Sequence, residues 1–237
     1  MLVKAAKDAA RIARRNFRAL VGTDFAVPTI SGVRSVRIGT EYGGWWVIPE
    51  LVNADSVVYG VGVGHDITWD LGMIERFGCR VHAFDPTPRS RTWIESQKLT
   101  DKFVFHPLGL AASDGVARFV MRSQDPTAAS YNKSDQTSGA AEVVELHVRR
   151  LATLMSDLGH TRVDVLKMDI EGSEYEVIED LLKTDVRPSL MLIEFHYWTN
   201  PKADVPRTVR AIESLRGAGY QVFARSPAGP ELCFVKR

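Results

Sequence analysis

Apolar runs of strand length alternate with helical patterns along most of this chain. Five such runs occupy residues 56–59, 80–84, 102–106, 163–168 and 190–195. Residues 67–77, between the first two runs, carry apolar side chains at helical spacing, and residues 174–182 show the same pattern between the last two. Strands that alternate with helices form a parallel sheet that is covered on both faces. The sequence therefore predicts a doubly wound α/β fold.

The C-terminal part of the chain breaks this alternation. A helix is expected at about 205–215, and strands are expected at 220–225 and 232–236, with only six residues between them. A parallel crossover needs a dozen or more residues, so these two strands must pair as an antiparallel hairpin. A mostly parallel sheet that ends in such a hairpin is typical, by analogy of fold, of the Rossmann-like class I methyltransferases.

Length, composition and charge favour one globular domain preceded by a short helix. The chain has 237 residues, of which 45% are hydrophobic and 25% charged, as in ordinary soluble proteins. Residues 1–22 are expected to form a basic amphipathic helix that packs on its own domain, with binding to a membrane or to an anionic ligand as alternatives. Residues 23–237 are expected to form one class I methyltransferase domain. The net charge of +1 gives no reason to expect a nucleic acid partner.

The cysteines and the hydropathy pattern indicate a cellular compartment. Cys79 and Cys233 are far apart in apolar surroundings, which suits buried thiols in a reducing compartment. No apolar run reaches the roughly 18 residues of a membrane span, and the N-terminus lacks the apolar region of a signal peptide. The sequence therefore predicts a cytoplasmic protein without a membrane span.

The stretch VVYGVGVGHD, residues 57–66, joins the first strand of the pattern to a glycine loop. Glycines at this place let the backbone approach a nucleotide cofactor closely. The loop departs from the dinucleotide pattern G-x-G-x-x-G, because His65 stands where the third glycine belongs and no acid precedes the first glycine. The residues expected to contact a cofactor here are Tyr59, Gly60, Val61, Gly62 and Gly64.

Two acidic residues narrow the choice of cofactor. Asp85 ends the second strand about 20 residues after the loop, where an acid binds the ribose hydroxyls of an adenosine cofactor. Asp66 stands where the next helix begins, either as its N-cap or beside the ligand, and its charge would repel the pyrophosphate of NAD or FAD. S-adenosylmethionine has no phosphate and carries an ammonium and a sulfonium, so the pattern favours it. A nicotinamide-dependent oxidoreductase is the alternative.

Four segments together resemble one enzyme family. The glycine loop with Asp66 is followed by FDPTP at 84–88, VLKMDIEGSEYEVI at 165–178 and LIEFH at 192–196. From about Trp45 to its end, the chain is similar to FkbM-type methyltransferases, particularly the branch of methyltransferase-like proteins with the phrase FDPTP. The resemblance implies a class I fold, S-adenosylmethionine as methyl donor and usually an oxygen acceptor. This chain lacks the acid before the glycines, so Asp66 or Asp169 would have to bind the methionine end, and a catalytically silent scaffold of the same fold is a further alternative.

The remaining cofactor contacts are expected at the ends of the second and third strands. Pro86 and Thr87 follow Asp85 directly. Gly109 and Leu110 follow the third strand, where the adenine of such cofactors usually lies. A polar stretch at 123–142, with Tyr131 as its aromatic residue, is expected to be either a cover over the acceptor or an insertion.

Catalytic residues are expected where the fourth and fifth strands end over the methyl group. His196 is the first choice for the base that removes the acceptor proton, with a solvent-facing or core-capping role as the alternative. Glu194 is expected to orient His196 or to bind sugar hydroxyls. Asp169 is placed to meet the methionine end or the acceptor, and Lys167 to pair with one of these acids. The expected acceptor is a hydroxyl of a small molecule or sugar.

A metal ion is not expected from this sequence. Asp169, Glu171 and Glu194 are carboxylates of the kind that bind magnesium in some oxygen methyltransferases, but nothing in their spacing demands an ion.

Overall fold

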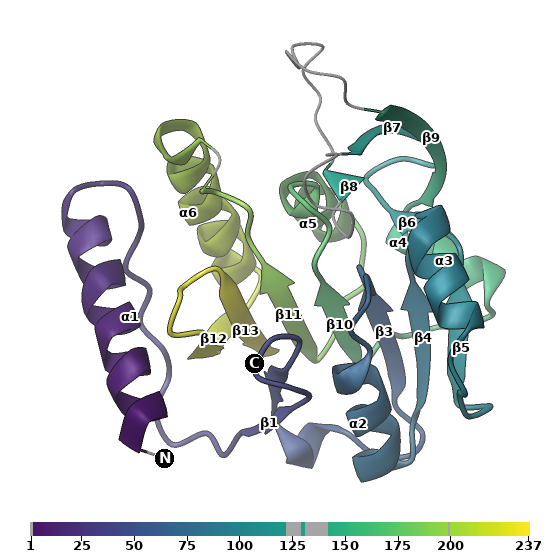
Figure 1. The fold of residues 1–237 in the computed structure, drawn as a ribbon, viewed down its shortest axis with the longest axis horizontal. Helices are drawn as coiled ribbons and strands as arrows, with labels where there is room; N and C mark the ends of the chain where they lie inside the picture. Colours follow the sequence, from purple (N-terminus) through teal and green to yellow (C-terminus); the bar gives the residue numbers. More distant parts are fainter. Residues whose placement is uncertain (1, 122–128, 131–141, 199) are drawn as a thin grey trace.

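The computed structural model describes residues 2–121, 129–130, 142–198 and 200–237, and its main element is a seven-stranded sheet (Figure 1). The strand order is β12-β13-β11-β10-β3-β4-β5. The bounds are Val57–Val61 for β3, Arg80–Phe84 for β4, Phe103–His106 for β5, Val165–Met168 for β10, Leu190–Glu194 for β11, Tyr220–Arg225 for β12 and Glu231–Lys236 for β13. Strand β13 pairs antiparallel with β11 and β12, while the other pairs are parallel. The predicted fold class is confirmed.

Helices cover both faces of this sheet because successive strand residues point to opposite sides. On β3, Val58 belongs to one apolar cluster and Tyr59 to the other. The first cluster includes residues of α2 (Thr68–Phe77) and α3 (Pro88–Glu95), together with the small hairpin of β1 (Val36–Ile38) and β2 (Trp45–Val47). It also includes Ile48 and Val52, which flank the 3-10 turn at Pro49–Leu51. The second includes residues of α4 (Leu151–Asp157), α5 (Glu174–Leu182) and α6 (Pro201–Gly217).

Helix α6 begins earlier than the sequence pattern predicted. It starts at Pro201 rather than near residue 205, and it contains Pro206 in its interior. A proline suits the first turn of a helix, where its missing N–H has no partner to lose. Both prolines offer such a start, and the structure uses the first of them.

A second, four-stranded sheet is formed by strands that follow β5 in the chain. Its order is β6-β9-β7-β8, from Gly109–Leu110, Glu142–Arg149, Gly115–Met121 and Ala129–Ser130. Strands β7 and β9 form its long antiparallel pair. The stretch 123–142 was predicted to lack regular structure, but it contains β8 and the first residue of β9, whereas Tyr131 lies outside the described residues.

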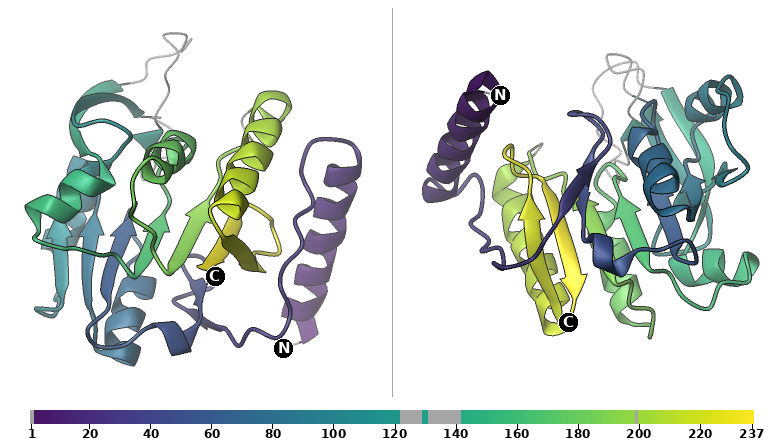
Figure 2. Two further views of the ribbon diagram at one scale, coloured as in Figure 1. Left: turned by 180° about the vertical axis from the view of Figure 1, so that it is seen from behind. Right: turned by 90° about the horizontal axis from the view of Figure 1, so that it is seen from below.

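Helix α1 (Leu2–Leu20) stands beside β12 and β13, at one edge of the sheet (Figure 2). Its contacts are polar: Arg15 donates to the Ser226 carbonyl at 3.0 Å, and Arg18 pairs with the buried carboxylate of Asp24 at 2.9 Å. Apolar side chains such as Phe17 and Leu20 are exposed. The predicted helix is present, but arginines rather than an apolar face attach it to the domain.

Both cysteines agree with the sequence analysis. Cys79 and Cys233 are buried and form no disulfide. In the part of the chain that the structure describes, no helix has the length and apolar character needed to cross a membrane.

Three histidines cluster beside Tyr59: His82 is buried, and His106 and His160 are half-buried. His82 Nδ1 lies 3.1 Å from His106 Nε2, and His160 Nδ1 lies 2.7 Å from the Tyr59 hydroxyl. Burial, assisted by the charges of His160, His106 and Arg80, lowers the pKa of His82 to about 4. His82 is therefore neutral in the folded protein at neutral pH.

This neutral histidine makes stability depend on pH. In the unfolded chain, His82 takes up a proton as the pH falls through its ordinary value of 6.5, whereas the folded chain resists protonation down to about pH 4. The stabilisation is thus complete above pH 6.5 and is lost as the pH falls, by about 2 kcal/mol between pH 7.5 and 5.

Urea unfolding of a His82→Gln variant at pH 7.5 and 5.0 measures this contribution. The loss of unfolding free energy between the two pH values should be about 2 kcal/mol smaller than in the wild type. His147→Gln, which changes an exposed histidine of β9, should keep the full dependence. Equal pH dependence in His82→Gln and the wild type would contradict the assignment.

Candidate active site

A cleft of about 660 Å³ opens where β3 and β10 end. These strands are neighbours in the sheet, but the chain continues from β3 to β4 on one side and from β10 to β11 on the other. In doubly wound sheets, ligands bind in the crevice that such a reversal creates. The volume lies within the range of small-molecule sites.

Most of the predicted site residues line this cleft. They come from the glycine loop, from the ends of β4, β10 and β11, and from β6. The predicted residues found in the wall are Val61, Gly62, Gly64, Asp66, Asp85, Pro86, Thr87, Gly109, Leu110, Lys167, Asp169 and Glu194.

Tyr59 and Gly60 were predicted to contact the cofactor, but they lie inside the sheet rather than in the cleft wall. Tyr59 is fully buried, and its hydroxyl bonds to His160. A Cβ added to Gly60 would meet the Asp70 carboxylate on α2. Both residues lie within β3, before the bend of the loop, so they face the packed sides of the sheet rather than the cleft.

The glycine loop is fixed by backbone contacts and leaves space at one position. Gly62 has φ +80°, donates to the Phe84 carbonyl at 2.9 Å, and faces the carbonyl oxygen of Asp169 so closely that a Cβ would overlap it. Gly64 has φ +54°, and a Cβ there would meet no atom within 4 Å. Because Gly64 lines the cleft, this open space fits a ligand that approaches the backbone.

Asp85 holds the glycine loop against the end of β4. Its buried carboxylate accepts hydrogen bonds from Gly64 N at 3.0 Å, Thr87 N at 2.9 Å and Thr87 Oγ1 at 2.6 Å. A carboxylate offers about four acceptor sites, so one site is available for a ligand hydroxyl.

Asp66 brings a negative charge to the other end of the loop. Its Oδ1 accepts from Thr68 N at 2.8 Å and Thr68 Oγ1 at 2.6 Å, and its Oδ2 accepts from Thr40 Oγ1 at 2.9 Å. Burial alone would raise the pKa of Asp66, but these hydrogen bonds lower it. Asp66 therefore binds Thr68, the first residue of α2, although the N-cap position predicted for it is taken by Ile67. It also lines the cleft as an ionised group.

Lys167 lies under the loop. Its Nζ donates to the Gly62 carbonyl at 3.4 Å and sits 5.9 Å from the ring centre of Trp45 and 6.0 Å from that of Trp69. Its charge also acts on Asp66 and Asp169. Lys167 thus offsets part of the negative charge that the cleft gathers.

The acidic end of the cleft is formed by residues that follow β10 and end β11. Asp169 and Glu194 both line the cleft, and their side chains are hydrogen-bonded. Burial raises the pKa of Asp169, and burial together with the charge of Asp169 raises the pKa of Glu194. The two carboxyl groups therefore share a proton more readily than isolated acids would.

His196 was predicted to be the base that touches the acceptor, and the structure corrects this. It is absent from the cleft wall and lies behind the acids, with Nδ1 2.8 Å from Glu174 Oε1. Burial alone would lower the pKa of His196, but the hydrogen bond and charge of Glu174, with the charges of Asp169 and Glu171, raise it to about 10. A histidine held in this way, behind the acids of the cleft, does not act as a free base for an acceptor hydroxyl.

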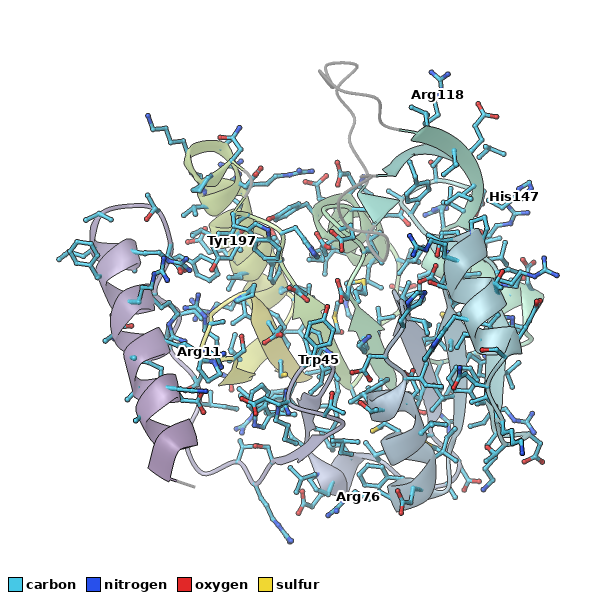
Figure 3. All side chains as sticks on the ribbon, in the orientation of Figure 1. Arg11, Trp45, Arg76, Arg118, His147 and Tyr197 are labelled. Carbon is cyan, nitrogen blue, oxygen red and sulfur yellow. The ribbon has the colours of Figure 1, made fainter. Side chains whose placement is uncertain are left out.

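Several residues of the cleft wall were not among the predicted site residues. Trp45 and Trp46 both line the cleft, although neighbouring residues of a strand point to opposite faces. Arg11 on α1 also lines it, on the side of α1 that faces the sheet, and Trp45 lies over the middle of the sheet (Figure 3). Further wall residues are Asp8, Arg37, Glu41, Tyr42, Gly43, Val63, His65, Phe119, Ile170, Glu171, Ser173, Ser226, Pro227, Ala228 and Glu231.

Only some of these residues could have been recognised as site residues from the sequence. The basic character of α1 indicated an anionic ligand as one alternative to simple packing, which is consistent with Arg11. The segment 226–228 belongs to the turn between β12 and β13, which the sequence marks only as a short connection.

Two solved structures and a curated relative are similar to this chain. Methyltransferase FkbM from Methylobacillus flagellatus KT has a TM-score of 0.46 and 15% identity, with 77% of this chain and 44% of that chain covered. Aeropyrum pernix fibrillarin, solved with natively bound S-adenosyl-L-methionine, has a TM-score of 0.43 and 12% identity, with 88% and 83% covered. Probable methyltransferase-like protein 24 from Homo sapiens is 28% identical over 152 residues, which is 63% of this chain. The matched region spans 35% of that relative, about a third of its length.

The family profile gives the assignment. The profile of the methyltransferase FkbM domain matches residues 61–222. This range contains the loop from Gly62 to Gly64, Asp85, Asp169 and Glu194, which line the cleft together. S-adenosylmethionine, the cofactor that the resemblance implied, is the one that this match supports. The chain belongs to the FkbM family of methyltransferases.

Proposed function

We propose that this chain transfers a methyl group from S-adenosylmethionine to a hydroxyl group of a small molecule or sugar. The observation that carries the proposal is the division of one cleft into two parts. The glycine loop and Asp85 form one part, and the carboxyl groups of Asp169 and Glu194 form the other. When bound, S-adenosylmethionine supplies the electrophilic methyl group on its sulfonium.

Residues of the first part fit an adenosine. The free acceptor site of Asp85 suits a ribose hydroxyl, and the open space at Gly64 lets the cofactor lie against the backbone. Gly109 and Leu110 form the wall beyond Pro86, where the adenine is expected.

Asp66 is the acid that we assign to the ammonium group of the methionine end. It lines the cleft two residues after Gly64, and its hydrogen bonds keep it ionised. Asp169, the other candidate, is joined to Glu194 and faces His196. Its place in this cluster favours contact with the acceptor instead.

The acceptor part offers groups that bind and deprotonate a hydroxyl. Asp169 and Glu194 are placed to accept its proton while the oxygen attacks the methyl carbon and the carbon–sulfur bond breaks. Arg37, stacked 5.1 Å from the ring centre of Trp46, and Glu231 add donors and acceptors suited to a polyhydroxylated molecule. The comparisons lend no support to a nicotinamide cofactor or to a silent scaffold.

Calorimetric titration and a labelled methyl donor test the proposal. The wild type should bind S-adenosylhomocysteine and not NAD, and it should label at least one member of a panel of hydroxylated acceptors. Asp66→Asn should weaken S-adenosylhomocysteine binding about tenfold, because one charge-assisted hydrogen bond is lost. Asp169→Asn should keep that affinity within a few-fold and lose turnover.

Each arm has an outcome that counts against the proposal. Binding of NAD without S-adenosylhomocysteine would overturn the cofactor, and absence of labelling across sugars, phenols and alcohols would favour the scaffold. Weakened cofactor binding in Asp169→Asn but not in Asp66→Asn would exchange the roles of these acids.

A further inference from the structure

Three potential metal ligands from two loops converge at the acidic end of the cleft. His196 Nε2 lies 3.4 Å from Glu171 Oε2 and 3.7 Å from Asp169 Oδ1. One atom of each side chain lies within 4.8 Å of the other two. Ligand atoms that bind one ion at about 2.1 Å are roughly 3.0 to 3.5 Å apart, so small side-chain rotations would bring all three onto one ion.

Glu174 is hydrogen-bonded to His196 and to the backbone on both sides of Glu171, and so fixes two of the three ligands. Its Oε1 lies 2.8 Å from His196 Nδ1 and also accepts from the backbone N–H groups of Ile170 and Gly172, at 3.3 and 3.0 Å. These two N–H groups flank Glu171, whose backbone adopts the left-handed conformation with φ +54°. A carboxylate that binds one imidazole nitrogen and leaves the other free to bind is the usual support of a metal-bound histidine.

The cluster also carries negative charge that the described protein groups do not balance. Glu174 is fully buried, and its second oxygen, Oε2, has no hydrogen-bond partner in the described part of the chain. Asp169, Glu171 and Glu194 lie beside the same imidazole. A buried carboxylate oxygen without a partner indicates a charge that a cation would compensate.

We propose that Asp169, Glu171 and His196 bind a divalent transition-metal ion. One imidazole nitrogen and two carboxylate oxygens suit Zn²⁺ or Mn²⁺ better than Mg²⁺, which prefers oxygen ligands alone. The sequence predicted no metal, because the residues occupy separate segments and Glu174, the supporting group, falls in the first turn of a helix.

The position of the ion site, at the acceptor part of the cleft, indicates a catalytic role for the ion. Asp169 and Glu171 line the cleft, so coordination positions away from His196 face the acceptor part. This role rests on the proposed function: the ion would hold the acceptor oxygen and make its hydroxyl more acidic beside Glu194. The ion site itself rests on geometry alone.

Metal titration of the full chain, after treatment with a chelator, tests the site without cofactor or acceptor. Calorimetry with ZnCl₂ should give one ion per chain, and MgCl₂ should bind at least tenfold more weakly. Glu171→Gln and His196→Gln should each weaken Zn²⁺ binding at least tenfold. Co²⁺ should give visible absorption bands that these variants lose.

The matched control is Glu95→Gln, which changes an exposed carboxylate on α3 and should leave Zn²⁺ affinity unchanged. Circular dichroism verifies that each variant is folded. Absence of saturable binding, or equal affinity in the wild type and both ligand variants, would overturn the site. Ion binding without methyl transfer to any acceptor would overturn the proposed function alone, and methyl transfer without ion binding would overturn the site alone.

Discussion

Replacing Gly62 with alanine is expected to lower the melting temperature by on the order of 10 °C. A Cβ at this position would overlap the backbone carbonyl oxygen of Asp169, and φ +80° is unfavourable for any residue with a side chain. Neither strand end can move freely, because β3 and β10 are paired along their whole length. We expect a loss of more than about 3 kcal/mol, measured by thermal or urea unfolding.

Gly64→Ala is the matched control for this variant. Gly64 also has positive φ, at +54°, but no atom lies within 4 Å of the added Cβ. Its cost should be limited to the backbone conformation, roughly 1 kcal/mol. Similar losses in the two variants would show that backbone conformation, and not the contact with Asp169, makes Gly62 necessary.

Asp85→Ala is expected to weaken S-adenosylhomocysteine binding on the order of 100-fold. The change removes a ligand acceptor and also frees Gly64 N and Thr87 N from the carboxylate that positions them. Calorimetric titration measures the affinity. Asp101→Ala, an exposed acid between α3 and β5, should bind like the wild type.

An analogue of S-adenosylhomocysteine that lacks the ribose hydroxyls separates the two roles of Asp85. Wild-type protein should lose affinity for the analogue, whereas Asp85→Ala should bind the analogue and the parent compound almost equally. The same relative loss in both proteins would restrict Asp85 to fixing the loop.

The strands of the seven-stranded sheet could be predicted because a local sequence pattern marks each of them. Each strand is an apolar run, and the short connection between β12 and β13, five residues in the structure, permits only a hairpin. Helix α6 was misplaced at its start because Pro201 and Pro206 offer the same local signal. The strands β7 and β9 were missed, since neither is an uninterrupted apolar run: Arg118, Glu145 and His147 alternate with apolar residues.

The site residues that stand at the carboxyl ends of strands could be predicted from the sequence. Parallel strands bring their carboxyl ends to one edge, which is why Asp85, Asp169 and Glu194 meet. The position of Arg11 depends on how α1 attaches to the domain, for example through Arg15 and the distant Ser226 carbonyl, which no local pattern reveals. The position of His196 behind the acids depends on Glu174 being buried, and a first-turn acid is usually exposed.

The sheet order also has a consequence for biosynthesis. Strand β13 is the last strand of the sheet in sequence, yet it lies between β12 and β11. A ribosome-bound chain that has not yet released residues 231–236 therefore exposes the backbone edge of β11, whose residues Leu190 to Ile193 are entirely apolar. Until that segment emerges, the nascent protein has an open strand edge that invites pairing with other chains, so its release marks the end of the period in which chaperones would be needed.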